Sequence, residues 1–148
     1  MMVKRKVKKH IVLFVGHVQS EAYRSLGREL IDLALPRFTG VALQRIHGDV
    51  RLANLIHRPG EGNFLIDFDD MAMGPVVQDL WLLLPGYRSE CEHELELLLE
   101  GYETFLEFPR SELSLIETLR AMRFIHFSAW CARQAGDGNF SETHPFCG

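Results

Sequence analysis

Carboxylate and amide side chains gather between residues 46 and 70, in the segment IHGDVRLANLIHRPGEGNFLIDFDD. Asp49 precedes Asn54 by five residues, so a single loop can return both side chains to one side, and Asp67 ends a later apolar run. Carboxylate and amide oxygens are hard ligands suited to Mg²⁺, which itself binds nucleotide phosphates. A second carboxylate nearby can orient a hydroxyl group and accept its proton. These residue types therefore indicate chemistry on phosphate groups.

Two short apolar runs must position these side chains. They cover residues 54–57 and 63–67, and the linker RPGEG at 58–62 separates them. A linker that contains Pro and Gly between two such runs is typical of a β-hairpin. The hairpin is expected to bring Asp67 against Asp49 around a metal ion.

The rest of the chain is predicted to be mainly helical. Apolar residues recur at intervals of three and four, which is the helical period. This spacing predicts helices over residues 20–37, 76–84, 90–107 and from Ser111 to about residue 130, with a short extended segment at 41–47. In the first helix, Ser20 is placed to cap, and the predicted apolar face contains Tyr23, Leu26, Leu30, Leu33 and Ala34. The predicted fold class is mainly α with a small β-hairpin.

Composition excludes several classes of protein. The 148 residues contain 16 Lys and Arg against 20 Asp and Glu, so the net charge of −4 disfavours nucleic acid as a partner. Residues 1–19 combine a basic run with an apolar stretch too short to span a bilayer, and we expect a tail there and one domain over 20–148. Cys91, Cys131 and Cys147 have no regular spacing, which predicts thiols in a reducing cytoplasm.

The segment at residues 47–54, HGDVRLAN, resembles the HGDxxxxN catalytic loop of the aminoglycoside-phosphotransferase-like kinases. Ile66-Asp67-Phe68 stands where those kinases carry their second metal-binding aspartate. Two motifs in this order are far more specific than either alone. Residues 69–81 and 119–123 further resemble the bacterial stress-response serine/threonine kinases of this superfamily.

The resemblance implies that Asp49 is the catalytic base and that Asn54 and Asp67 bind Mg²⁺. It also implies ATP as the phosphoryl donor and a hydroxyl-bearing acceptor, with the Ser/Thr side chains of a protein favoured. Asp69 and Asp70, next to the second motif, are expected to be cap or surface carboxylates.

Three further residues take supporting roles in the resemblance. His47 would brace the loop, and Asp79 would accept hydrogen bonds from its backbone N–H groups. Arg51 stands where many relatives have His and protein kinases have Lys, so a cation is retained where negative charge develops in the transition state.

The resemblance implies the C-terminal lobe of a protein-kinase-like α+β fold. Residues 1–19 do not resemble the N-terminal lobe that covers ATP, and residues 20–148 are expected to be a lobe shortened at both ends, so the residues of the ATP pocket stay unassigned. We therefore expect weak or no phosphotransfer by this chain alone. The alternatives are a kinase of small molecules related to aminoglycosides, choline or homoserine, or a catalytically inactive kinase fragment.

Overall fold

The computed structural model describes residues 21–134, with side chains described as far as residue 131. The predicted basic tail at 1–19 and the capping residue Ser20 lie outside this range. The chain divides into two compact units, one of residues 1–39 with 118–148 and one of residues 40–117. Each unit is described by itself below.

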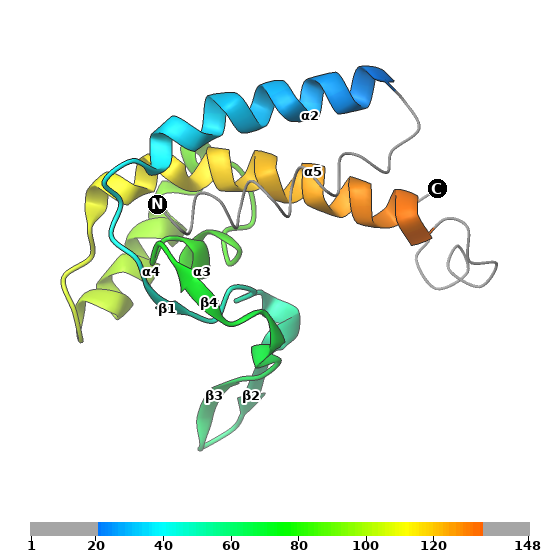
Figure 1. Cartoon of the computed structure of the whole chain (residues 1–148). Coiled ribbons are helices and arrows are strands. Elements are labelled where there is room, and N and C mark those ends of the chain that lie inside the picture. The colour runs from blue at the N-terminus through cyan, green and yellow to red at the C-terminus, as the bar shows by residue number, and fades with distance from the viewer. Residues whose placement is uncertain (1–20, 135–148) are drawn as a thin grey trace. The chain divides into compact units, whose positions relative to one another are not determined.

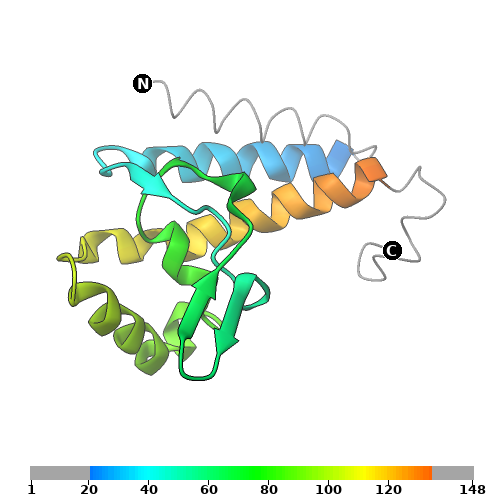
Figure 2. The same cartoon turned by 90° about the horizontal axis from the view of Figure 1, so that it is seen from below.

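The described part of the first unit contains two long helices, α2 (Glu21–Ala34) and α5 (Ile116–Gln134). The first two residues of α5 belong to the other unit. The two helices run antiparallel and side by side in both views (Figures 1 and 2). Ile31 and Ile125 are the buried centre of their contact, and Leu30, Leu35 and Met122 pack against them. The Tyr23 hydroxyl donates a hydrogen bond of 3.2 Å to the carbonyl of Ile125.

The buried face of α2 differs from the predicted one. Of the predicted face, Ala34 is buried, whereas Leu26 and Leu33 are 53% and 64% exposed, and the unpredicted Gly27 and Ile31 are buried instead. A repeat of three and four residues is compatible with two adjacent stripes on one helix, and the position of α5 decides which stripe is buried. The helix also ends earlier than predicted, at Ala34, where Pro36 lies in the 3-10 turn η1 (Leu35–Phe38).

The second unit contains two small antiparallel sheets. The predicted hairpin is confirmed: β2 (Leu55–Arg58) pairs with β3 (Gly62–Leu65), and the register sets Leu55 opposite Leu65. At the turn of this hairpin, Gly60 and Gly62 have φ values of +79° and +110°, a conformation that glycine adopts readily. The other sheet, β1 (Gln44–Ile46) with β4 (Ala72–Gly74), was not predicted, because its strands are distant in sequence and each is too short for a pattern.

The hairpin exposes part of its apolar content. Ile56 and Phe64 face each other across the strands and are 41% and 42% exposed. The guanidinium of Arg58 lies over the Phe64 ring, 5.1 Å from its centroid. Figure 1 shows the two strands extending away from the helices of the same unit. The hairpin is thus a carrier of the residues at its base rather than part of the core.

The core of the second unit comes from short helices. They are α3 (Gln78–Trp81), η4 (Arg88–Glu90), α4 (Glu92–Glu103) and η5 (Arg110–Leu115). Leu99 and Leu115 are almost fully buried, and so is Val77 at the start of α3. Two predictions need correction: only four residues of 76–84 form an α-helix, and Ser111 does not begin the last helix, since η5 starts after Pro109 and precedes α5.

Over residues 21–134 the fold is therefore mainly helical with two small sheets, one more than predicted. In the part of the chain that the structure describes, no helix combines the length and apolar character needed to cross a membrane. Cys91 is a buried free thiol. Cys131 is disulfide-bonded, so the prediction of three thiols is wrong for this residue.

Candidate active site

The loop between β1 and β2 carries most of the predicted site residues. We call residues 47–54 the HGD loop; its last residues form the 3-10 turn η2 (Leu52–Asn54). His47, Asp49 and Asn54 are buried, with exposed fractions of 6%, 7% and 4%. Polar groups are buried at a cost in free energy unless they form hydrogen bonds, so their partners define the site.

Asn54 bonds directly to Asp49. Its Nδ2 donates to the backbone carbonyl of Asp49 at 2.9 Å and to Oδ2 of the Asp49 carboxylate at 3.1 Å. Since both contacts use the amide nitrogen, the amide oxygen of Asn54 is directed to the other side, where it can serve as a ligand. The spacing of five residues thus returns both side chains to one place, as the sequence predicts.

Arg51 also bonds to Asp49. Its Nε lies 2.9 Å from Oδ2 of the carboxylate, while the arginine side chain is 48% exposed. Two donors, from Arg51 and Asn54, therefore converge on one oxygen of Asp49. They set the rotation of the carboxylate, and the cation lies at the edge of the site.

His47 braces the loop through both ring nitrogens. The N–H of Asp49 donates to Nδ1 at 3.3 Å, so Nδ1 acts as the acceptor of a neutral imidazole. Nε2 then carries the proton and donates to the carbonyl of Ile66 at 2.9 Å. The ring also lies against Phe68, with centroids 4.7 Å apart. His47 therefore connects the HGD loop to the segment on both sides of Asp67.

Asp67 lies beside the buried loop, at the end of the hairpin. The N–H of Ile66 donates to the carbonyl of Asn54 at 3.0 Å, which places Asp67 one residue from that contact. Asp67 is exposed and has φ +67°, and its side chain makes no capping hydrogen bond to the following turn η3 (Phe68–Asp70). Among residues without a glycine's freedom such a φ is uncommon, and it is often found at functional sites.

Asp79 holds the start of the HGD loop. Its Oδ2 accepts the N–H of His47 at 2.7 Å, and its Oδ1 accepts the N–H of Gly48 at 2.8 Å. Both of these short hydrogen bonds involve a carboxylate, which makes them stronger than neutral ones. The carboxylate sits in the first turn of α3, where a negative charge is favourable.

Gly48 has a role that sequence reasoning missed. Its φ is +90°, and a Cβ built on it would lie 2.5 Å from the carbonyl oxygen of Asp70. A side chain at this position therefore meets rigid backbone as well as an unfavourable conformation. Gly48 allows the HGD loop to approach the segment that follows Asp67, and the HGD motif itself was the available signal.

Gln78 was also missed as a contributor to the loop, although it neighbours Asp79. Its Nε2 donates to the carbonyl of Gly48 at 3.1 Å. Its Oε1 accepts the indole N–H of Trp81 at 3.1 Å. The sequence QDLW carries these residues, but without tertiary structure nothing indicates that they face the loop.

Glu112 binds the backbone at the start of α3. It is 4% exposed, and its Oε2 accepts the N–H of Val77 at 3.4 Å. Burial raises the pKa of this carboxyl group, and hydrogen bonds from the backbone of Val77 and Val76 oppose the rise. Glu112 stands between Ser111 and Leu113 in the sequence, which gave no signal that its side chain is buried.

The donor set near the HGD loop fits Mg²⁺. Within residues 21–134, no group of three or more Asp, Glu, His or Cys side chains is arranged to hold a metal ion. Mg²⁺ is usually bound through one or two carboxylates with water and substrate phosphates, rather than by a cage of protein ligands. The amide oxygen of Asn54 and the exposed carboxylate of Asp67 are a set of that kind.

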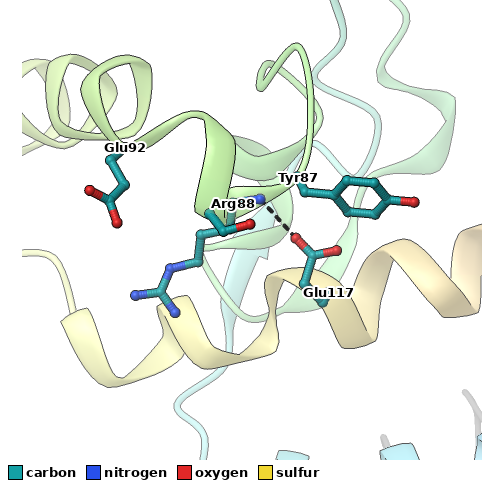
Figure 3. A pocket seen from close by; sticks show the side chains of 5 residues that line it. Tyr87, Arg88, Glu92 and Glu117 are labelled. Carbon is teal, nitrogen blue, oxygen red and sulfur yellow. Dashed lines mark hydrogen bonds between the residues drawn. The ribbon is translucent and has the colours of Figure 1, made fainter.

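A separate hollow lies between η4 and the start of α5. Tyr87, Arg88, Ser89, Glu92 and Glu117 line it (Figure 3). The backbone N–H of Arg88 donates to Oε1 of Glu117 at 2.9 Å, and the Arg88 guanidinium donates to the carbonyl of Leu113 at 3.3 Å. Its lining contains none of the residues predicted for the active site.

Comparison with known proteins decides the family. The model of the phosphotransferase enzyme family matches residues 18–124, which include the HGD loop, Asp67 and Asp79. The chain belongs to this family. Membership implies a kinase-like fold, and the resemblance drawn from the HGDxxxxN and Asp67 motifs is confirmed.

Several curated proteins are similar to this chain. Stress response kinase A of Escherichia coli K12 is 43% identical over 102 residues, which are 69% of this chain and 30% of that protein. Stress response kinase A of Salmonella choleraesuis and serine/threonine protein kinase RdoA of Salmonella typhimurium are each 42% identical over 108 residues, 73% of this chain and 32% of theirs. The chain thus spans about a third of the length of these relatives.

Proposed function

We propose that this chain carries the phosphoryl-transfer residues of an ATP-dependent kinase. The observation that carries the proposal is the buried carboxylate of Asp49, on which the side chains of Asn54 and Arg51 converge. A general base must be held in one orientation toward its acceptor hydroxyl, and these contacts provide that. Asp67, on the adjoining segment, supplies another carboxylate, and this one is proposed to bind the metal.

In the proposed reaction, Asp49 orients the acceptor hydroxyl and accepts its proton. The acceptor oxygen forms a bond to the γ-phosphorus of ATP while the bond from that phosphorus to the β,γ-bridging oxygen breaks, and ADP leaves with the electron pair. The exposed guanidinium of Arg51 lies at the edge of the site, where positive charge offsets the charge developing on the phosphoryl group.

Asn54 and Asp67 would hold Mg²⁺ in this proposal. The ion, when bound, neutralises the charge of the β- and γ-phosphates. Asn54 is suited to the role because its amide nitrogen is used by Asp49, which leaves the orientation of its amide oxygen determined.

Serine or threonine side chains of a protein are the proposed acceptor, in a stress response. The support is that the similar relatives are named as stress response kinase A and as a serine/threonine protein kinase. A small-molecule acceptor of the aminoglycoside, choline or homoserine class is the first alternative, and a catalytically inactive fragment is the second. We further propose a cytoplasmic location, no nucleic-acid or membrane partner, and weak or no transfer by this chain alone.

Transfer of radiolabelled phosphate from ATP tests the proposal. The full chain is incubated with Mg²⁺ and ATP and, in parallel, with a generic protein substrate and with aminoglycoside, choline and homoserine. Asp49→Asn is expected to lower any transfer by about 10²- to 10⁴-fold, because a general base contributes on that order. The matched control is Asp69→Asn, since Asp69 is an exposed carboxylate of the same segment.

The acceptor panel separates the alternatives. Labelling of protein that depends on Asp49 supports the protein-kinase proposal, and labelling confined to one small molecule replaces it with the first alternative. Transfer that survives Asp49→Asn contradicts the assignment of the base. Absence of transfer to every acceptor, by a chain whose circular dichroism is helical, favours the inactive fragment.

A further inference from the structure

The peptide group that joins Gly48 to Asp49 is hydrogen-bonded on both sides. Its carbonyl accepts from Nε2 of Gln78 at 3.1 Å, and its N–H donates to Nδ1 of His47 at 3.3 Å. The orientation of a peptide group determines the direction in which the next Cα presents its side chain. This peptide therefore sets the direction of the Asp49 carboxylate.

Trp81 determines which end of the Gln78 amide faces the loop. An indole N–H can only donate, so the atom of Gln78 that it contacts at 3.1 Å must be the oxygen. The amide nitrogen is then directed to the Gly48 carbonyl. Trp81 is 4% exposed and sits in the same turn of α3, so the indole is fixed by packing.

Gln78 and Asp79 bind different backbone groups of Gly48. Asp79 accepts its N–H, and Gln78 donates to its carbonyl. Consecutive residues of α3 thus hold both polar groups of the one residue in the loop whose φ of +90° makes it conformationally permissive. Without the second contact, the carbonyl end of the Gly48–Asp49 peptide could turn about the hydrogen bond from its N–H to His47 while the Asp79 contacts stayed intact.

We propose that Gln78, oriented by Trp81, is a positioning residue for Asp49. The proposal deepens the proposed function and rests on it for its catalytic meaning. Gln78 contacts neither substrate nor metal; it acts through the Gly48–Asp49 peptide. Its loss is expected to misalign the base while leaving Asp67, on the other segment of the site, in place.

Gln78→Glu is the sharpest variant, because it keeps the shape of the side chain. A glutamate at neutral pH can still accept from Trp81, but it has no proton to donate to the Gly48 carbonyl. Gln44→Glu is the matched control, since it makes the same change at an exposed position on β1. Trp81→Phe is the second variant; it keeps an aromatic ring and removes the indole donor.

Nuclear magnetic resonance of the ¹⁵N-labelled full chain gives a readout that needs no activity. The side-chain NH₂ of Asn54 bonds to Asp49, so its chemical shifts and hydrogen exchange report the position of that residue. We expect shifted signals and faster exchange in Gln78→Glu and in Trp81→Phe, and unchanged signals in Gln44→Glu. Asn54 signals that match the wild type in both variants would overturn the proposal, whether or not the chain transfers phosphate.

Kinetics give the second readout. We expect Gln78→Glu to lower kcat by about fivefold to tenfold, the effect of one neutral hydrogen bond, with the KM for ATP unchanged. A loss confined to KM, or an unchanged kcat, contradicts a positioning role. If the wild type transfers no phosphate to any acceptor, that result favours the inactive fragment over the proposed function, and the Asn54 signals test the structural link by themselves.

Discussion

Removing the charge of Asp79 should loosen the HGD loop. In Asp79→Asn, one oxygen can still accept a backbone N–H, but the new NH₂ group faces the other. One charge-assisted hydrogen bond, at 2.7 or 2.8 Å in the wild type, is then lost and a donor meets a donor. A hydrogen bond to a charged group contributes about 1.5 to 3 kcal/mol, and an unsatisfied buried donor costs about 1 to 3 kcal/mol. These two contributions describe partly the same lost contact and do not add in full, so we expect a loss of about 2 to 4 kcal/mol in the free energy of unfolding.

Urea denaturation measures this loss. Trp81 lies two residues from the substitution and is buried, so its fluorescence follows the region, while far-ultraviolet circular dichroism follows the helices. Asp69→Asn serves as the control, because an exposed substitution changes stability by about 0.5 kcal/mol or less. If Asp79→Asn also stays within about 0.5 kcal/mol of the wild type at an unchanged denaturant slope, the two hydrogen bonds do not anchor the loop and the reasoning is refuted.

Two other substitutions test the surroundings of the loop. Gly48→Ala should lower the free energy of unfolding, measured in urea, by at least about 2 kcal/mol, because it combines a left-handed φ with a clash against the carbonyl of Asp70. The control Gly60→Ala has φ +79° and open space around the added Cβ, so it should lose about 1 kcal/mol. Equal losses in the two variants would contradict the clash. Glu112→Gln tests the raised pKa of that carboxyl group. Above about pH 4.5 the Glu112 carboxyl loses its proton in the unfolded chain but keeps it in the folded chain, so the free energy of unfolding of the wild type should fall as pH rises toward the pKa in the folded state. The Gln variant should lack this fall, so denaturation at pH 4 and pH 7 should show it gaining on the wild type, in contrast to the exposed control Glu92→Gln.

Local sequence was sufficient for the hairpin and for the candidate site. The linker RPGEG between two apolar runs predicted the pairing of β2 with β3, because a hairpin is set by neighbouring residues. The spacing from Asp49 to Asn54 predicted their meeting for the same reason, since a loop of five residues can close on itself. The roles of base and metal ligand for these residues stay predictions.

Contacts between distant segments were beyond the sequence. The pairing of β1 with β4 joins two three-residue strands, and such strands are too short to carry a period. The face of α2 that is buried depended on α5, which lies about a hundred residues later in the chain. The contacts of Gln78, Trp81 and Glu112 could not be predicted either, because their polar atoms meet their partners only once α3 has packed against the loop.

The sequence by itself determined the chemistry available to this protein: two carboxylates and an amide in a motif that places it in the phosphotransferase family. Residue types and short spacings suffice for that, because the chemistry of a side chain does not depend on the fold. The tertiary structure decided how the HGD loop that carries Asp49 is held, through α3 on one side and the segment around Asp67 on the other. Orientation arises from hydrogen bonds between segments distant in sequence, and only folding brings these segments together.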